Sequence, residues 1–266
     1  MRRPFHLLFC TVLCATSVAL AACGGGNQTQ QTPQTEGGAA PATPGAAVPA
    51  TVDAATAATV TGKVTFAGTP PPAQPVKLSS DPYCEKANAG LKTETEVIGS
   101  DGSVGNVFVY VKDGLGNRTF PAPSQPVVLD QKGCHYTPHV MGIQIGQPLQ
   151  IVNSDDTLHN VHGLAKSNKE FNQGQPIQGM KMTHTFSTKE VMIPFKCDVH
   201  GWMNAWIGVL DHPYYAVTSP DGTFSLKGLP PGTYTIEAWH EKLGTQTQTV
   251  TVGEKETKNL AFTFKA

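Results

Sequence analysis

The sequence has few charged residues, and this scarcity argues against several classes of function. Only 15% of its 266 residues are Asp, Glu, Lys or Arg, and the formal net charge is -1. Without a basic excess the chain has no electrostatic reason to bind nucleic acid, so we expect no such partner. The sequence also lacks a nucleophile triad, a phosphate-cradling glycine loop and a Cys-x-x-Cys-His haem attachment motif. We therefore expect a protein that is not an enzyme.

Long helical periods and long hydrophobic runs are missing as well. The longest apolar run, residues 7–22, falls short of the roughly 20 residues that a membrane-spanning helix needs. Glycine (27) and proline (21) are plentiful, and the remaining apolar segments are short and often alternate with polar residues. This pattern is typical of short strands joined by turns, and it predicts an all-β fold.

The N-terminal segment has the features of an export signal. Arg2 and Arg3 precede the apolar run, which ends in Leu-Ala-Ala-Cys at positions 20–23. This tetrapeptide resembles the lipobox of bacterial lipoproteins. The resemblance implies that residues 1–22 are a signal peptide, that Cys23 carries lipid, and that the protein is exported and lipid-anchored to the cell envelope, on its periplasmic or outer face. An ordinary cleaved signal with an incidental cysteine is the alternative.

The segment after this signal has a composition that cannot form a core. Residues 23–58 are mostly Gly, Gln, Thr, Pro and Ala, with almost no charged or large apolar side chains. We expect a disordered tether between the membrane and the folded part.

The six cysteines fall into two groups of three. Three belong to the signal or the lipid site and three to the mature protein: Cys10, Cys14 and Cys23, then Cys84, Cys134 and Cys197. In an oxidising exported setting two of the mature cysteines should pair, and the third needs a separate reason to stay free. Our hypothesis is a disulfide between Cys84 and Cys134, which leaves Cys197 as the free thiol.

The strand-like segments form three groups, separated by a proline-rich stretch at 120–126 and by Pro213. We expect strands at 60–66 and 104–111; at 127–129, 143–145, 149–152, 159–164, 182–186, 191–195 and 205–210; and at 215–217, 224–226, 234–239, 246–252 and 260–264. Residues 80–96 show no period, and we expect a loop there with one helical turn anchored by Cys84.

A cluster of metal-binding residue types lies in the middle group. Residues 197–203 read Cys-Asp-Val-His-Gly-Trp-Met, which places a thiolate, an imidazole and a thioether at three-residue steps. One cysteine, two histidines and a weakly bound methionine are the donors of electron-transfer copper sites. The second histidine is expected upstream, and His159 is our candidate.

The segment from Ile143 to Val209 resembles the cupredoxins, the blue copper proteins. The resemblance rests on His-Asn-Val-His at 159–162, and on the Cys-x-x-His-x-x-Met loop in the short form seen in amicyanin, followed by the strand at 205–210. It implies a Greek-key sandwich with one mononuclear type 1 copper bound by His159, Cys197, His200 and Met203. It also implies single-electron transfer to a redox partner, a cytochrome or a dehydrogenase.

Neighbouring residues of this loop have expected roles and open alternatives. Asn160 is expected to tie the two ligand loops together and to hydrogen-bond the Cys197 sulfur. His200 with Trp202 could form the surface through which electrons pass. His162 is the alternative to His159 as a ligand. Met180, Met182 or a backbone carbonyl is the alternative to Met203 in the axial position. Gly201 leaves a single thiolate in the loop and disfavours a dinuclear centre. A copper carrier or storage protein, or a structural or adhesion sandwich, remain alternative functions.

Two further segments resemble a carboxypeptidase regulatory-like, or transthyretin-like, β-sandwich. Residues 218–236, with Asp-Gly-Thr-Phe at 221–224 and Leu-Pro-Pro-Gly at 229–232, resemble its second half, and residues 60–111 resemble its opening. We infer that segments 59–119 and 213–266 form one sandwich, interrupted by the copper module at 120–212. Two consecutive sandwiches are the alternative.

Overall fold

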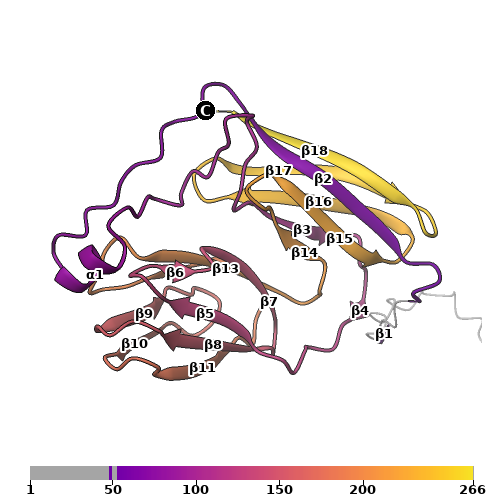
Figure 1. The fold of residues 1–266 in the computed structure, drawn as a ribbon. Helices are drawn as coiled ribbons and strands as arrows, with labels where there is room; N and C mark the ends of the chain where they lie inside the picture. Colours follow the sequence, from indigo (N-terminus) through magenta and orange to yellow (C-terminus); the bar gives the residue numbers. More distant parts are fainter. Residues whose placement is uncertain (1–47, 50–52, 266) are drawn as a thin grey trace, which may run out of the picture. The chain divides into compact units, whose positions relative to one another are not determined.

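The computed structural model describes residues 48–49 and 53–265, and these residues form almost entirely β-structure (Figure 1). The strands are β1 (Val48–Pro49), β2 (Ala58–Ala67), β3 (Phe108–Asp113), β4 (Arg118–Thr119), β5 (Val127–Gln131), β6 (Tyr136–Thr137), β7 (Val140–Gln144), β8 (Pro148–Asn153), β9 (His159–Gly163), β10 (Phe171–Gln175), β11 (Lys181–Thr185), β12 (Glu190–Lys196), β13 (Asn204–Leu210), β14 (Tyr215–Val217), β15 (Thr223–Leu229), β16 (Gly232–His240), β17 (Gly244–Val252) and β18 (Thr257–Lys265). The helix α1 (Pro82–Ala87) has six residues. The described part of the chain contains no helix of the length and hydropathy that crossing a membrane demands. The expected all-β fold is confirmed.

One sandwich is assembled from strands at both ends of the described chain. Its sheets have the orders β15-β2-β18 and β14-β3-β16-β17. β2 alternates buried and half-buried residues along nine positions and pairs in parallel with β18, almost 200 residues later. Apolar side chains between the two sheets, such as Val64, Ile236 and Phe262, form one buried cluster. The strands before and after residues 120–212 therefore share one core.

The second sandwich consists of strands β5 to β13. Its sheets have the orders β10-β9-β12-β13-β7 and β11-β8-β5-β6. β8 alternates strictly, with Leu149 and Ile151 directed into the core, as expected for a strand with one buried face. The core of this sandwich also includes Cys197 and Met203.

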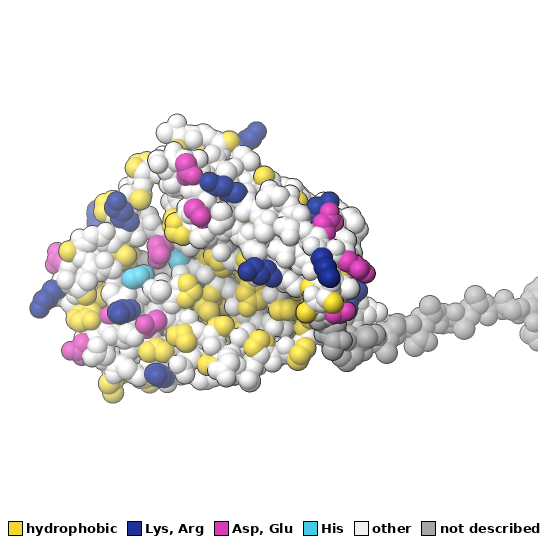
Figure 2. All heavy atoms as spheres, turned by 45° about the vertical axis from the view of Figure 1, so that its right-hand side comes forward, with side chains coloured by type: hydrophobic (Ala, Val, Ile, Leu, Met, Phe, Trp, Pro, Cys, Tyr) yellow, Lys and Arg dark blue, Asp and Glu magenta, His cyan; other side chains and the backbone are white. Residues whose placement is uncertain are grey.

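The two sandwiches pack through a third apolar cluster. It contains Phe108 of β3, Val140 of β7 and Leu210 of β13. Glycine makes the close approach possible, because a Cβ atom on Gly208 would lie 2.5 Å from the Phe108 ring. On the face drawn in Figure 2, Lys, Arg, Asp and Glu side chains are scattered with the signs mixed, and apolar side chains gather between them.

A long excursion connects β2 to β3 and carries α1 to the second sandwich (Figure 1). The helix begins at Asp81, whose carboxylate accepts hydrogen bonds from the backbone N–H groups of Tyr83 and Cys84, and Pro82 suits the first helical position. Cys84 and Cys134, the expected pair, form a disulfide. The first sandwich is thus covalently joined to the second through this excursion.

The structure extends or corrects the expected boundaries at several places. Order begins before residue 59: Asp53 accepts a hydrogen bond from the backbone N–H of Ala55, and Ala58 is buried, so the last residues of the expected tether are structured. The strands β6 and β10 in the second sandwich were not expected. The predicted signal peptide, Cys23 and the tether up to residue 47 lie outside the described residues.

Candidate metal centre

The loop from Cys197 to Met203 is closed by its own backbone. The N–H of Cys197 donates to the carbonyl of Met203, and the N–H of Met203 donates to the carbonyl of His200. The backbone N–H of His200 lies 3.3 Å from the Cys197 sulfur. These bonds turn the chain back between β12 and β13 and hold His200 beside the thiol.

His159, the first residue of β9, completes a group of three donors. Its Nδ1 lies 3.1 Å from Nδ1 of His200, and that atom lies 3.9 Å from Sγ of Cys197. One ligand atom from each of the three residues falls within 4.8 Å of the others. All three side chains are buried, with His159 0% exposed and His200 3%. The structure thus brings together three of the four expected ligands.

In both histidines, the ring nitrogen that faces away from this group is hydrogen-bonded to a carboxylate. Nε2 of His159 lies 2.9 Å from Asp155, and Nε2 of His200 lies 2.9 Å from Asp81. A carboxylate accepts, so each Nε2 carries the proton and each Nδ1 keeps a free lone pair. Two lone pairs and a thiol therefore meet at one buried point, which is an unfavourable arrangement unless a cation or a shared proton lies between them. The donor set fits copper or zinc.

Asp155 is itself held by the loop that contains the disulfide. Its two carboxylate oxygens accept the backbone N–H groups of Gly133 and Cys134, each at 2.8 Å. Both of these residues have positive φ, a conformation in which successive N–H groups converge on an anion. Burial alone would raise the pKa of Asp155, but the bonds from His159 and from these N–H groups lower it. The carboxylate stays ionised and fixes the His159 ring.

The Cys197 thiol lies in surroundings that favour the thiolate. Burial raises its pKa, but the hydrogen bond with His159 and those from the backbone N–H groups of His200, Asn160 and Val199 outweigh burial and lower it. The thiolate is the form that binds metal. For His159, burial lowers the pKa, and the bonds with Asp155 and Cys197 raise it overall.

Asn160 links the two ligand loops through both its side chain and its backbone. Its side-chain Oδ1 accepts the backbone N–H of Asp198 at 2.8 Å, which ties β9 to the closing loop. Its Nδ2 donates to Asn172. The hydrogen bond to the Cys197 sulfur comes from the backbone N–H of Asn160.

Met203 lies in the core cluster that also holds Cys197 and is 1% exposed. Met182 packs against the same cluster from β11 and is partly buried. The role of Met203 as the weak fourth ligand stays a prediction.

The expected electron-transfer surface is wrong with respect to His200. The imidazole is covered by Asp81, and by the disulfide, whose Cys84 sulfur lies 3.8 Å from Nε2 of His200. Trp202 is partly exposed and lies against His200 with ring centroids 5.0 Å apart. Its Nε1 donates to the carbonyl of Cys134. Of the two residues, Trp202 is the one that reaches the surface.

The other histidines have different partners. His162, three residues along β9, faces away from the core and is bonded to Asp198 and Glu170, which excludes it from this donor group. His139 bonds to Glu241, and His184 stacks on Phe171 with ring centroids 4.1 Å apart.

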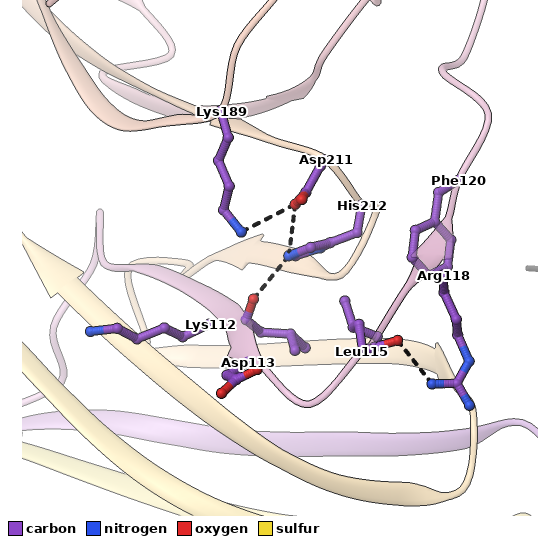
Figure 3. Close-up of a pocket in the computed structure, with 10 residues that line it drawn as sticks. Lys112, Asp113, Leu115, Arg118, Phe120, Lys189, Asp211 and His212 are labelled. Carbon is purple, nitrogen blue, oxygen red and sulfur yellow. Dashed lines mark hydrogen bonds and ion pairs between the residues drawn. The ribbon is translucent and has the colours of Figure 1, made fainter. Parts of the chain in front are cut away.

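A cavity of about 210 Å³ elsewhere in the molecule is lined mainly by charged and polar side chains (Figure 3). His212 lies at its wall and donates from Nε2 to the carbonyl of Val111, and burial lowers its pKa to about 4. Lys189 is bonded to Asp211 at 3.1 Å, and Arg118 donates to the carbonyl of Leu115. These side chains therefore have partners in the other side chains of the cavity or in the backbone.

Two residues of the centre were missed from the sequence. Asp155 lies four residues before His159 in a polar loop, and this spacing was an available signal. Asp81 lies 119 residues from its partner His200, and only its position before Pro82 as a helix cap could be read locally.

Comparison with known proteins finds one matching family model and several similar solved structures. Residues 204–265 match the family model of the carboxypeptidase regulatory-like domain. The match begins with β13, although β13 pairs with β12 and β7 of the other sandwich. No curated protein matches the chain.

Several solved structures that are similar to part of the chain are named as copper proteins or cupredoxins. They include the Cu-containing nitrite reductase of Thermus scotoductus SA-01 (20% identity, 34% of this chain, TM-score 0.31), an amicyanin variant in its Cu(I) form (20% identity, 32% of this chain and 81% of that chain, TM-score 0.29) and a purple cupredoxin from Nitrosopumilus maritimus (19% identity, 32% of this chain and 97% of that chain, TM-score 0.27). The chain spans 23% of the length of the nitrite reductase. This similarity concerns the fold.

Proposed function

We propose that the protein is an exported, lipid-anchored electron carrier with one mononuclear type 1 copper, and that it turns over no substrate. The ligands would be Nδ1 of His159, Nδ1 of His200, Sγ of Cys197 and the thioether of Met203. The lipid on Cys23 would hold it at the bacterial cell envelope.

The observation that carries the proposal is the convergence of three donors of the right chemical type. Two imidazole Nδ1 atoms and a thiol of lowered pKa lie within 4.8 Å of one another in a buried site, and among the described contacts no N–H or O–H group outside these three side chains donates to either Nδ1 atom. Copper bound there would supply a centre that gains and loses one electron. The chain's own contribution is rigidity, since hydrogen bonds fix both rings and the sulfur.

Rigidity matters because electron transfer is fast only when the ligands move little between oxidation states. Asp155 and Asp81 fix the rotation of the two imidazoles. Asn160 connects the two loops that carry the ligands. The donors are thereby held in one arrangement for both oxidation states.

A redox partner, a cytochrome or a dehydrogenase, would approach the end of the sandwich where Trp202 is partly exposed. Val199 in the closing loop and Leu158 beside His159 also expose apolar side chains there, at 48% and 44%. Apolar side chains on both ligand loops suit a weak, transient interface.

The decisive experiment is titration of the metal-free protein with Cu(II), followed by visible spectroscopy and electrochemistry. We expect an intense thiolate-to-copper band and reversible reduction in the wild type, and no band in Cys197→Ser. A wild type without the band would overturn the proposal. Copper that binds and passes readily to a chelator would favour a carrier or storage role, and the absence of copper binding would favour a structural or adhesion sandwich.

The anchor is tested separately. Mass spectrometry of the N-terminal peptide from cells should find a lipid-modified Cys23, and Cys23→Ser should release the protein from the membrane fraction. An unmodified cysteine would leave only an ordinary export signal.

A further inference from the structure

The excursion from the first sandwich carries a carboxylate, that of Asp81, onto one of the expected ligand rings. This residue lies in the excursion between β2 and β3, outside the module that supplies the expected ligands. Its Oδ1 accepts the backbone N–H groups of Tyr83 and Cys84, at 2.8 and 3.2 Å. Its Oδ2 accepts Nε2–H of His200 at 2.9 Å and the hydroxyl of Thr157 at 3.3 Å.

We propose that Asp81 is a positioning residue of the copper centre: it directs Nδ1 of His200 at the metal and makes that imidazole a stronger electron donor. The inference rests on the proposed function for its effect on copper. The orientation of the ring, however, is a property of the metal-free protein and can be measured without copper.

Three features make Asp81 an anchor rather than an incidental neighbour. Each of its carboxylate oxygens has a separate partner, because one caps α1 and the other accepts a hydrogen bond from the imidazole. The disulfide from Cys84 to Cys134 fixes α1 against the second sandwich. Tyr83 of α1 donates to Asp155, the carboxylate on the other histidine, at 3.2 Å. The excursion therefore touches the supports of both ligand rings.

The electronic consequence follows from the charge of the acceptor. A carboxylate that accepts Nε2–H draws the proton toward itself and increases the electron density on Nδ1. A stronger donor stabilises Cu(II) more than Cu(I), so the reduction potential of the wild type should lie below that of variants without the carboxylate. Because the ring cannot rotate freely, the copper should also dissociate more slowly.

Two substitutions separate positioning from helix capping. Asp81→Ser keeps a capping oxygen but is too short to reach His200 as well. Asp81→Asn keeps the shape but has one carbonyl oxygen, which cannot serve both the helix and the imidazole. Glu85→Gln is the matched control, because Glu85 is an exposed acid on the same helix and its substitution removes the same charge.

The first measurement uses nitrogen-15 NMR of the metal-free protein. We expect a protected Nε2–H signal for His200 in the wild type and in Glu85→Gln, and its loss or large shift in Asp81→Ser and Asp81→Asn. The second measurement is the reduction potential of the copper-loaded proteins, which should rise in both Asp81 variants and stay unchanged in Glu85→Gln.

Failure of the positioning role of Asp81 can be distinguished from failure of the proposed copper function. If the Asp81 variants keep the wild-type ring signal, or if copper loads and their potentials equal that of the wild type, the positioning role is wrong. If the wild type forms no copper band at all, the proposed function fails, and the ring signal still decides whether Asp81 orients His200.

Discussion

Nδ1 of His159 and Nδ1 of His200 lie 3.1 Å apart, and each ring is held from behind by a carboxylate. This pairing directs both Nδ1 atoms at the same buried point before any metal is bound. A site formed in advance needs little rearrangement on binding, so metal affinity depends on keeping both rings in place.

The histidines of β9 provide a direct test of this arrangement. His159→Ala should abolish the thiolate-to-copper band, because it removes one of the converging donors. His162→Ala should retain it, because His162 is bonded to Asp198 and Glu170 on the other face of the strand. Copper titration of both variants, followed in the visible range, checks the prediction. Retention of the band in His159→Ala would refute the assignment.

Trp202 should control electron exchange more than copper binding. Replacement by Ala removes the ring that contacts His200 but none of the expected ligands. We expect an unchanged copper band and slower reduction by the partner in stopped-flow measurements. Trp206→Phe is the control, since the Trp206 indole donates to Glu241 and not to the disulfide loop. Equal rates in wild type and Trp202→Ala would rule out the docking role.

The disulfide should contribute a large share of the stability. It closes a loop of 50 residues, for which loop-closure entropy predicts about 4 kcal/mol of stabilisation. The double variant Cys84→Ala, Cys134→Ala should therefore lower the free energy of unfolding by up to this amount in urea titrations. Cys197 is not involved, so the variant should still bind copper while folded. A loss below about 1 kcal/mol would mean that the unfolded chain is already restricted.

The pair His139 and Glu241, between the sandwiches, makes stability depend on pH. Burial lowers the pKa of His139, but the bond with Glu241 raises it overall; burial raises the pKa of Glu241, but the bond with His139 lowers it overall. The His139 contribution is complete below about pH 6.5 and is lost as pH rises through its higher folded-state pKa. The Glu241 contribution is present above about pH 4.5 and is lost as pH falls through its lower folded-state pKa.

The wild type should therefore gain the most from this pair between about pH 4.5 and 6.5. Glu241→Gln should reduce the free energy of unfolding there by roughly 1–3 kcal/mol, because it leaves a buried group poorly paired. Urea titrations at a series of pH values measure this. Parallel pH profiles for wild type and variant would exclude the pair as the cause.

A side chain at position 208 should lower the stability of the protein. A Cβ atom would lie 2.5 Å from the Phe108 ring, in the cluster that joins the sandwiches. Gly208→Ala should cost roughly 1–3 kcal/mol in denaturant unfolding, as overpacked cores do. Gly174→Ala is the matched control in β10, where a Cβ atom would meet nothing within 4 Å. Equal stabilities would show that the two sandwiches can shift apart at no cost.

The sequence predicts those strands in which apolar and polar side chains alternate, because one face of the strand is buried. β2 and β8 alternate clearly, because one face of each lies in a core. β10 reads Phe-Asn-Gln-Gly-Gln and lies at the edge of its sheet, and its most buried residue, Gln175, is polar, so the strand shows no apolar alternation. β6 has only two residues, too few for any period.

The metal centre likewise has a part that the sequence predicts and a part that it does not. Cys197 and His200 share one loop, and their spacing is visible in the sequence. Asp81 acts on His200 across 119 residues, and no local pattern encodes such a contact. The cover over His200 also depends on this distant segment, which is why the residue was expected at the surface.

The parallel pairing of β2 with β18 has a consequence for the order in which the molecule is completed. As the chain is synthesised, β2 and the Asp81 segment emerge first, but β2 has no sheet partner until β15 and β18 follow more than 150 residues later. Strands β5 to β13 are contiguous and can close their own core in the meantime. The second sandwich can therefore fold before the first one is complete. Once folded, it holds the N-terminal and C-terminal strands of the first sandwich near each other.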